Sequence, residues 1–341
     1  MTDNAWIAVG DVDGDGMNDA ALVSHDCDWA VYVHAGPFAL DGSTTWISDS
    51  AYAWRGPVPN QGDWMWQTAA GGDLDGDGLD DLVGTSGGTL DDAGVCSFDV
   101  FLGGAWDAPV ARVSDVAPNG LTYSARYLHV LEDTDGDGMA EVEASLGSGV
   151  HAFIRGADAS TGDGALATDL AYAILQGHPD DAVDDIWGES NIASVGDWNG
   201  DGTADIVAVA RASATLGYEH GEVFLLDGSL RGELSLDDAL GSWVGTDGNV
   251  RFFGQLDADG DGEPELIVND YGYGTHILRH VLPAMRTPLD GIVLTDSATT
   301  RGSTGDFNAD GYDDWVVGDL TEKTQNLWFG FDIPWDDARY W

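Results

Sequence analysis

The sequence predicts an all-β fold, a β-propeller of six four-stranded blades with one acidic loop in each blade. Three observations lead to this prediction. An acidic nonapeptide occurs six times, short β-branched or aromatic runs follow each copy, and glycine contributes 48 of the 341 residues. The number of residues from the start of the sixth copy through the C-terminus to the start of the first copy is nearly that of one repeat. The chain could therefore close on itself after six units. Seven blades are the alternative if the chain extends further.

The repeated nonapeptide follows the pattern D-x-[DN]-x-D-G-x-x-[DE]. We number its residues as positions 1 to 9 and name its copies the first to sixth acidic loops, which are residues 11–19, 73–81, 133–141, 197–205, 257–265 and 306–314. The spacing predicts one propeller domain over residues 1–341, with repeats at approximately 1–60, 61–120, 121–185, 186–245, 246–297 and 298–341.

Each repeat contains four short segments that are typical of strands. One segment leads into the acidic loop, as in 6–10, and an apolar run leaves it, as in 20–23. A third run such as 222–226 and a weaker fourth such as 291–294 complete the repeat. Runs of this length bounded by Gly and Asp favour strands over helices. A blade cannot bury both faces alone, so we expect neighbouring blades to form the core.

The charge of the chain excludes several classes of partner. The formal net charge is -49, which disfavours binding to nucleic acid and to anionic lipid surfaces. The sequence has no apolar window long enough to insert into a membrane. Hydrophobic residues make up 43% of the chain and include 14 Trp, enough to build a core. The two cysteines, Cys27 and Cys96, are too few for a disulfide framework, and their pairing stays open.

The acidic loops have the chemistry of calcium sites. Positions 1, 3 and 5 carry oxygen-bearing side chains, the Gly at position 6 permits a sharp turn, and the acid at position 9 can complete the coordination. A carbonyl near position 7 usually adds a further oxygen. Hard oxygen ligands without His or Cys favour Ca²⁺ over Zn²⁺, and a nearly all-protein cage suits Ca²⁺ better than Mg²⁺. We expect about six structural calcium ions, held by Asp11, Asp13, Asp15, Met17, Asp19, Asp73, Asp75, Asp77, Leu79, Asp81, Asp133, Asp135, Asp137, Met139, Glu141, Asp197, Asn199, Asp201, Thr203, Asp205, Asp257, Asp259, Asp261, Glu263, Glu265, Asp306, Asn308, Asp310, Tyr312 and Asp314.

Two other interpretations of the loops are weaker. An EF-hand needs an acid at position 12, and the residues there are Leu22, Gly84, Ala144, Ala208, Val268 and Val317. The second alternative is that the copies are polar hairpin turns, because Asp-Gly is a common turn pair. Six copies with three or four carboxylates each argue against this, since so much like charge would repel itself without a cation.

The nonapeptide, often preceded by Gly, resembles the calcium loop of FG-GAP repeats. Trp187-Gly188 stands where Phe-Gly would, and Val-Gly follows two loops at Val83-Gly84 and Val317-Gly318. FG-GAP repeats build the β-propeller of integrin α-subunits and of many bacterial surface proteins. The resemblance implies that each loop joins the first two strands of a blade on one face, with ligands on the opposite face. It implies an extracellular or cell-surface adhesion or recognition module, most often one monomeric domain. No signal peptide is visible at Met1.

The alternative function is carbohydrate binding, either as a lectin-like propeller or as a non-catalytic domain of a secreted carbohydrate-active enzyme. Its candidate residues are Trp54, Trp187 and Trp243, which lie in or near segments that join blades and could stack on sugars. The opposing interpretation is that they wedge between blades, as Trp29, Trp315 and Trp328 are expected to do inside strands. We expect no catalytic residues, because no acid–base set clusters in the sequence.

Overall fold

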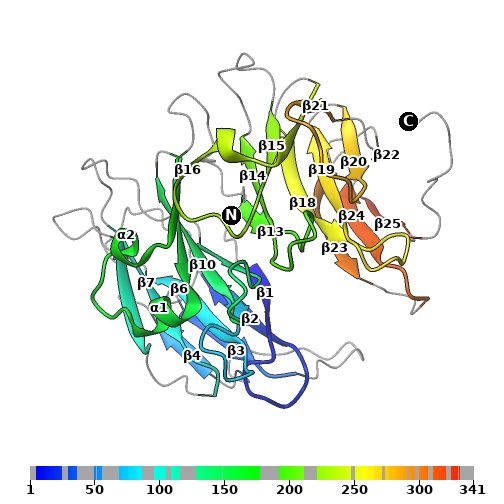
Figure 1. Ribbon diagram of the computed structural model, residues 1–341. Helices are drawn as coiled ribbons and strands as arrows, with labels where there is room; N and C mark the ends of the chain where they lie inside the picture. The colour runs from blue at the N-terminus through cyan, green and yellow to red at the C-terminus, as the bar shows by residue number, and fades with distance from the viewer. Residues whose placement is uncertain are drawn as a thin grey trace, which may run out of the picture. The chain divides into compact units, whose positions relative to one another are not determined.

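In the computed structural model, more than half of the described residues lie in strands, which form six sheets, and two short α-helices accompany them (Figure 1). The described residues are 5–24, 30–36, 50, 52–55, 69–86, 96–104, 109–115, 128–147, 149–176, 192–210, 221–246, 250–270, 273–289, 292–295, 299–305, 310–319, 324–328 and 330. They divide into two compact units. Unit 1 is Met1–Gln176 with Arg231–Leu234, and unit 2 is Gly177–Leu230 with Ser235–Trp341.

Unit 1 holds three sheets. The first runs in chain order through β1 (Ala5–Gly10), β2 (Asp19–Ser24), β3 (Ala30–His34) and β4 (Tyr52–Arg55). The second does the same through β5 (Ala69–Gly72), β6 (Asp81–Ser86), β7 (Cys96–Phe101) and β8 (Ala111–Asp115). The third has β9 (Leu128–Leu131), β10 (Glu141–Gly147), β11 (Val150–Arg155), β12 (Ala173–Gln176) and β16 (Gly232–Ser235). Consecutive strands pair antiparallel.

Unit 2 holds the other three sheets. The fourth has β13 (Ile192–Ser194), β14 (Ile206–Ala210), β15 (Glu222–Leu226), β17 (Gly241–Val244) and β21 (Thr287–Pro288). The fifth has β18 (Val250–Leu256), β19 (Glu265–Asp270), β20 (Gly274–Leu278) and β22 (Ile292–Thr295). The sixth has β23 (Thr299–Gly305), β24 (Asp314–Asp319) and β25 (Thr324–Trp328).

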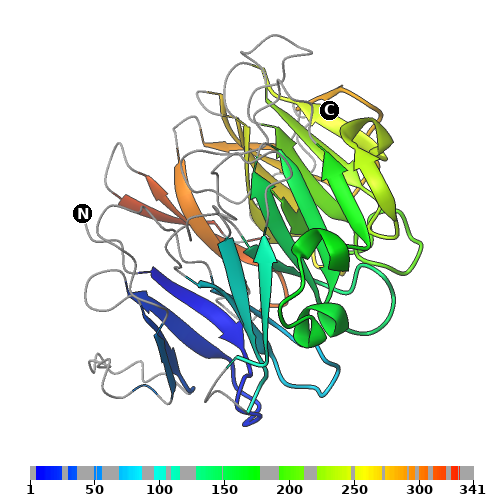
Figure 2. The ribbon, with the colours of Figure 1, turned by 90° about the vertical axis from the view of Figure 1, so that its left-hand side faces the viewer.

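Short helices fill connections between strands. Helices α1 (Gly156–Thr161) and α2 (Ala167–Leu170) follow β11 and pack against β8 and β11 in unit 1 (Figure 2). A single 3₁₀ turn, η2 (Leu236–Asp238), follows β16. Within the part of the chain described here, no helix is long and apolar enough to span a membrane.

The fold is a β-propeller, but the prediction of six four-stranded blades is wrong. Five sheets have the four or five strands of a full blade, and the sheet β23–β25 has three among the described residues. Two sheets gain a strand because a later connection reaches their outer edge. The Gly232 N–H donates to the Tyr172 carbonyl at 2.9 Å where β16 joins the third sheet. Likewise, β21 pairs parallel with β17, and the Leu289 N–H donates to the Val244 carbonyl at 2.8 Å.

The core of each unit lies between sheets, as the repeat pattern predicts. The unit 1 cluster combines side chains from neighbouring sheets, among them Val83, Phe98, Val113, Leu128, Val142 and Ile154. The unit 2 cluster is built in the same way, with Val207, Leu225, Val250, Leu266 and Val268. Trp315 in β24 is also buried, which confirms its predicted packing role.

The acidic loops lie where the sequence places them. Each of the first five loops connects the first strand of its sheet to the second, from β1–β2 to β18–β19. The sixth stands between β23 and β24, but its residues 306–309 lie outside the described residues.

Candidate metal centres

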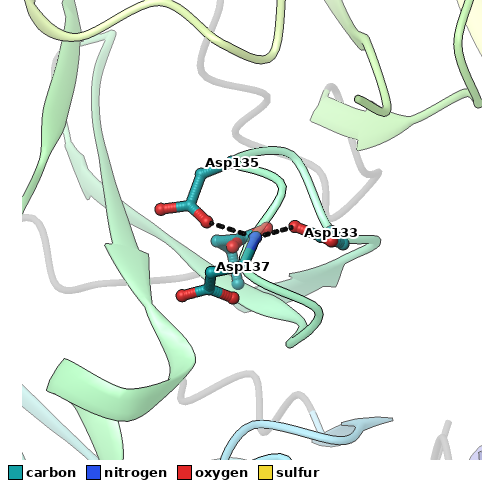
Figure 3. Close-up of side chains that lie close together, drawn as sticks. Asp133, Asp135 and Asp137 are labelled. Carbon is teal, nitrogen blue, oxygen red and sulfur yellow. Dashed lines mark hydrogen bonds between the residues drawn. The ribbon is translucent and has the colours of Figure 1, made fainter. Parts of the chain in front are cut away.

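The third acidic loop shows how these nine residues fold. The carboxylate of Asp133 at position 1 accepts the backbone N–H groups of Gly136 at 2.6 Å, Asp137 at 3.1 Å and Gly138 at 2.9 Å. Gly136 and Gly138 have φ angles of 78° and 88°, a region that favours glycine. Asp135 Oδ1 accepts the Asp137 N–H as well, at 3.2 Å. The loop thus winds tightly around the position 1 carboxylate, and the three aspartates converge (Figure 3).

The same winding recurs in the other described loops. Position 1 accepts the N–H groups of positions 4 and 6, for example Gly14 and Gly16 on Asp11, both at 2.8 Å. Four loops bring carboxylate oxygens within 4.8 Å of one another. The groups are Asp11, Asp13 and Asp15; Asp73, Asp75 and Asp81; Asp133, Asp135, Asp137 and Glu141; and Asp257, Asp259 and Glu265. Each could hold a metal ion.

The prediction of one equivalent calcium loop in every blade does not hold. The fourth loop winds in the same way but forms no such group of acids among the described residues. Its position 3 is Asn199, whose amide donates to Asp201 at 3.1 Å and to Asp205 at 3.2 Å. The Asn199 amide therefore forms hydrogen bonds with carboxylate oxygens that would otherwise be available to bind a cation. In the sixth loop, Asp306 and Asn308 lie outside the described residues.

Position 9 divides the loops into two classes. Where it is Asp, backbone N–H groups reach both oxygens. Asp81 accepts the N–H of Leu74 at 2.8 Å and that of Gly103 at 2.7 Å. Asp19 does the same with Val12 at 3.0 Å and Gly36 at 2.7 Å. The hydrogen bonds from Gly36 and Gly103 therefore link the position 9 side chain to the end of the third strand of its blade.

In the third loop, where position 9 is Glu141, one carboxylate oxygen has no hydrogen-bond donor among the described residues. Glu141 Oε2 accepts the Thr134 N–H at 2.7 Å and the Thr134 hydroxyl at 2.9 Å. Glu141 Oε1 is buried and has no hydrogen-bond partner among the described residues, in a residue that is 0% exposed. A buried carboxylate oxygen without a partner is costly. A cation at the centre of the group would satisfy it.

The protonation of position 9 reflects this environment. Burial, together with the charges of the neighbouring Asp135 and Asp133, raises the pKa of Glu141 to about 7 against the hydrogen bonds from Thr134. Burial likewise raises the pKa of Glu265 to about 8, together with the charges of Asp259 and Asp261. A bound cation would reverse this effect, because it favours the ionised carboxylate.

Hydrogen bonds also link one acidic loop to the next, which the sequence pattern did not reveal. The N–H at position 8 donates to the carbonyl at position 1 of the preceding loop. The Asp80 N–H donates to the Asp11 carbonyl at 3.0 Å, and the Asp80 carboxylate accepts the Asp11 N–H at 2.7 Å. The Ala140 N–H bonds the Asp73 carbonyl at 2.7 Å. In the fifth loop, position 8 is Pro264, which has no N–H to donate.

The glycine that ends the third strand also has a packing role, which the sequence alone did not reveal. A Cβ at Gly156 would lie 2.4 Å from the Ala140 carbonyl oxygen and 2.4 Å from that of Leu74. A Cβ at Gly103 would lie 2.5 Å from the Leu79 Cβ. Only glycine lets this strand end approach the loop so closely. The recurring glycines at 36, 103, 156, 228 and 330 were the available signal.

The proposed carbohydrate-binding tryptophans receive no support as a group. Trp243 lies in β17 and is only 6% exposed, and its ring packs edge-on against Trp198 with centroids 5.7 Å apart. Its ring therefore offers no open face for a sugar, which corrects that expectation. Trp187 lies outside the described residues, as does the side chain of Trp54 in β4.

A buried ionic cluster in the third sheet was not anticipated. Glu143 in β10 is 0% exposed, and its two oxygens contact His129 Nδ1 in β9 and His151 Nδ1 in β11, each at 2.7 Å. Burial opposes ionisation of Glu143, yet the two histidine contacts outweigh it and lower the pKa to about 2. The cluster ties three adjacent strands together. A Glu between apolar strand residues was the only sequence signal.

The fold and the acidic groups define the class of protein: a β-propeller with clusters of carboxylates that could hold metal ions. No protein-family model matches the chain, and neither does any curated protein. Solved structures similar to it include BBS1N in complex with ARL6DN, in crystals soaked with mercury or with lead. Each is 10% identical and covers 98% of this chain and 93% of that one, with TM-scores of 0.44 and 0.43.

A further similar structure is the V. cholerae biofilm matrix protein Bap1. It is 12% identical, covers 98% of this chain and 60% of that one, and has a TM-score of 0.29. At these identities, the likeness concerns the fold alone.

Proposed function

We propose that this chain is a calcium-binding β-propeller of the FG-GAP type, in which calcium is structural. The observation that carries the proposal is the buried Glu141 Oε1, which has no hydrogen-bond partner among the described residues and belongs to a group with Asp133, Asp135 and Asp137. A polar turn that needed no cation would not keep this oxygen buried and unsatisfied. The group contains four carboxylates and no nitrogen or sulfur ligand, which suits Ca²⁺.

The arrangement supports a structural role for the ion. The acidic loop joins the first two strands of a blade, and its position 9 side chain bonds the backbone at position 2. The loops also bond to each other through positions 8 and 1. A cation that relieves charge repulsion in one loop therefore stabilises the strand pair and its neighbour. Such a cage leaves little room for a reactive water, and we propose that the protein is not an enzyme.

Calorimetric titration of the calcium-stripped protein with calcium chloride tests the proposal. Glu141→Gln replaces a ligand oxygen with an amide and removes one charge from the third loop. We expect it to lose about one calcium equivalent, or to weaken that site at least about tenfold, because a lost charged ligand costs about 1.5–3 kcal/mol. Glu233→Gln is the matched control, since Glu233 is exposed on β16 of the same sheet. Unchanged stoichiometry and affinity in Glu141→Gln would contradict the proposal.

The wider biological role is also a proposal. The resemblance of the loops to FG-GAP repeats supports an extracellular or cell-surface recognition module that binds a protein or glycan on the face opposite the calcium loops. A pull-down with surface extracts, with and without calcium, tests this role. Loss of capture on calcium removal is expected, and capture by the calcium-free protein at equal strength would argue against it.

A further inference from the structure

The third and fifth acidic loops combine two unusual features. They are the loops with Glu rather than Asp at position 9, and both have Arg at the end of the third strand. Glu141 pairs with Arg155 in the register of β10 and β11. Leu266 pairs with Leu278 in the fifth sheet, which places Arg279 opposite Glu265. In the other four repeats, the corresponding residues are Ala35, Leu102, Asp227 and Phe329.

In the third loop, the arginine contacts a candidate ligand directly. Arg155 Nε bonds Asp135 Oδ2 at 2.5 Å, and a second guanidinium, from Arg231, lies 3.7 Å from the same oxygen. The Asp135 side chain is 4% exposed, whereas the position 3 residues Asp13 and Asp75 are exposed. The other oxygen of Asp135, Oδ1, faces into the loop and accepts the Asp137 N–H. Asp135 is thus held between the guanidinium groups and the loop.

A tyrosine connects this ion pair to position 9. The guanidinium carbons of Arg155 and Arg231 lie 5.4 Å and 4.4 Å from the centroid of the Tyr172 ring. The Tyr172 hydroxyl bonds Thr134 Oγ1 at 2.8 Å, and Thr134 in turn donates to Glu141. One continuous network therefore fixes two of the four carboxylates of the group, Asp135 and Glu141.

We propose that Arg155 is a positioning residue of the third metal centre and its resident counter-charge. It holds Asp135 in the ligand position and keeps the third loop closed when calcium is absent. Arg279 has the corresponding place in the fifth loop. The proposal rests on the calcium function proposed above, and it adds that the acidic loops differ in how far their structure depends on the ion.

The physical reason lies in the charge of the loop. Without a cation, four carboxylates within 4.8 Å repel one another, and local opening relieves the repulsion. A fixed guanidinium offsets part of this charge, and its planar group orients the carboxylate that it bonds.

Hydrogen–deuterium exchange of the whole protein, with and without calcium chloride, tests the proposal. In the calcium-free wild type, residues 128–147 should exchange more slowly than residues 69–86, because the second loop has no arginine at this place. Arg155→Met keeps the length of the side chain and removes its charge. We expect it to speed exchange of 128–147 at least about tenfold without calcium, the effect of losing one charge-assisted hydrogen bond. Calcium should restore most of the protection.

Two further variants separate charge from packing. Arg155→Lys keeps the charge and should retain part of the protection, whereas Arg286→Met removes an exposed positive charge elsewhere and should leave 128–147 unchanged. Equal acceleration by Arg155→Met with and without calcium, or none without calcium, would overturn the proposal. If calcium protects no loop of the wild type, the proposed calcium function fails and this inference fails with it. If calcium protects 69–86 and the calcium-free wild type exchanges 128–147 equally fast, only the inference fails.

Discussion

Removing calcium is expected to lower the melting temperature of this protein by at least about 10 °C. An ion present at 100 times its dissociation constant adds about 2.7 kcal/mol to stability at each site. One kcal/mol corresponds to about 2–4 °C in domains of 150–250 residues. Three of the four acidic groups lie in unit 1, so several sites act on the same core. Differential scanning calorimetry before and after treatment with a chelating resin measures the change.

Recovery of the melting temperature should also be specific for calcium. Calcium added back should restore the melting temperature, while an equal concentration of magnesium should restore little of it. The reason is that Mg²⁺ requires a small octahedron and keeps several of its waters. An unchanged melting temperature after verified calcium removal would contradict the structural role, and equal rescue by magnesium would contradict the choice of calcium.

Glu143→Gln is the substitution with the largest expected effect on stability, about 3–5 kcal/mol, the usual cost of breaking a buried ion pair. The two carboxylate oxygens of Glu143 contact one histidine nitrogen each at 2.7 Å. Glutamine has one acceptor oxygen and an amide that donates, so one of the two histidine contacts would be lost. Urea unfolding in saturating calcium measures the change without altering metal occupancy.

The exposed Glu233→Gln is the control for this experiment, and we expect it to change stability by less than about 0.5 kcal/mol. A further comparison uses pH. Because the pKa of Glu143 is lowered, its contribution is present above the ordinary glutamate range and is lost as the pH falls toward about 2. A Glu143→Gln variant as stable as the control variant near pH 7 would show that the cluster contributes nothing.

The metal centres could be predicted from the sequence because their ligands are local. Nine residues carry the three aspartates and the turn glycines, so a pattern read along the chain captures the geometry of Asp133, Asp135 and Asp137. The position of each described loop between the first two strands of its sheet could also be predicted. In the fourth loop, the sequence does not distinguish an Asn that offers its oxygen to a cation from one whose amide donates, and Asn199 donates to its neighbours.

The number of strands in each blade was predicted wrongly because two of the strands lie in connections. Strands β16 and β21 are short and lie in connections, at residues 232–235 and 287–288. Their pairing is decided by which sheet edge is within reach rather than by local propensity. The same holds for Glu143, whose partners are 14 and 8 residues away on adjacent strands. Contacts set by tertiary neighbours are invisible to a repeat pattern.

The arginine at the end of the third strand could be predicted from the sequence in part. Arg155 and Arg279 both stand 22 residues after position 1 of their loops, so the regularity is present in the sequence. Its meaning becomes visible only when the strand register places Arg155 opposite Glu141. A second signal in the sequence is that position 9 of these two loops is Glu instead of Asp.

A crystal structure of the protein grown in calcium chloride would show whether the acidic loops bind calcium. We expect a calcium ion in the third acidic loop, at about 2.3–2.6 Å from its oxygen ligands, with Glu141 Oε1 among them. We also expect Asp135 to keep its contact with Arg155 while its other oxygen binds the ion. A third loop that holds only water at saturating calcium, with Glu141 Oε1 bonded to a protein donor, would show that this loop is not a calcium site.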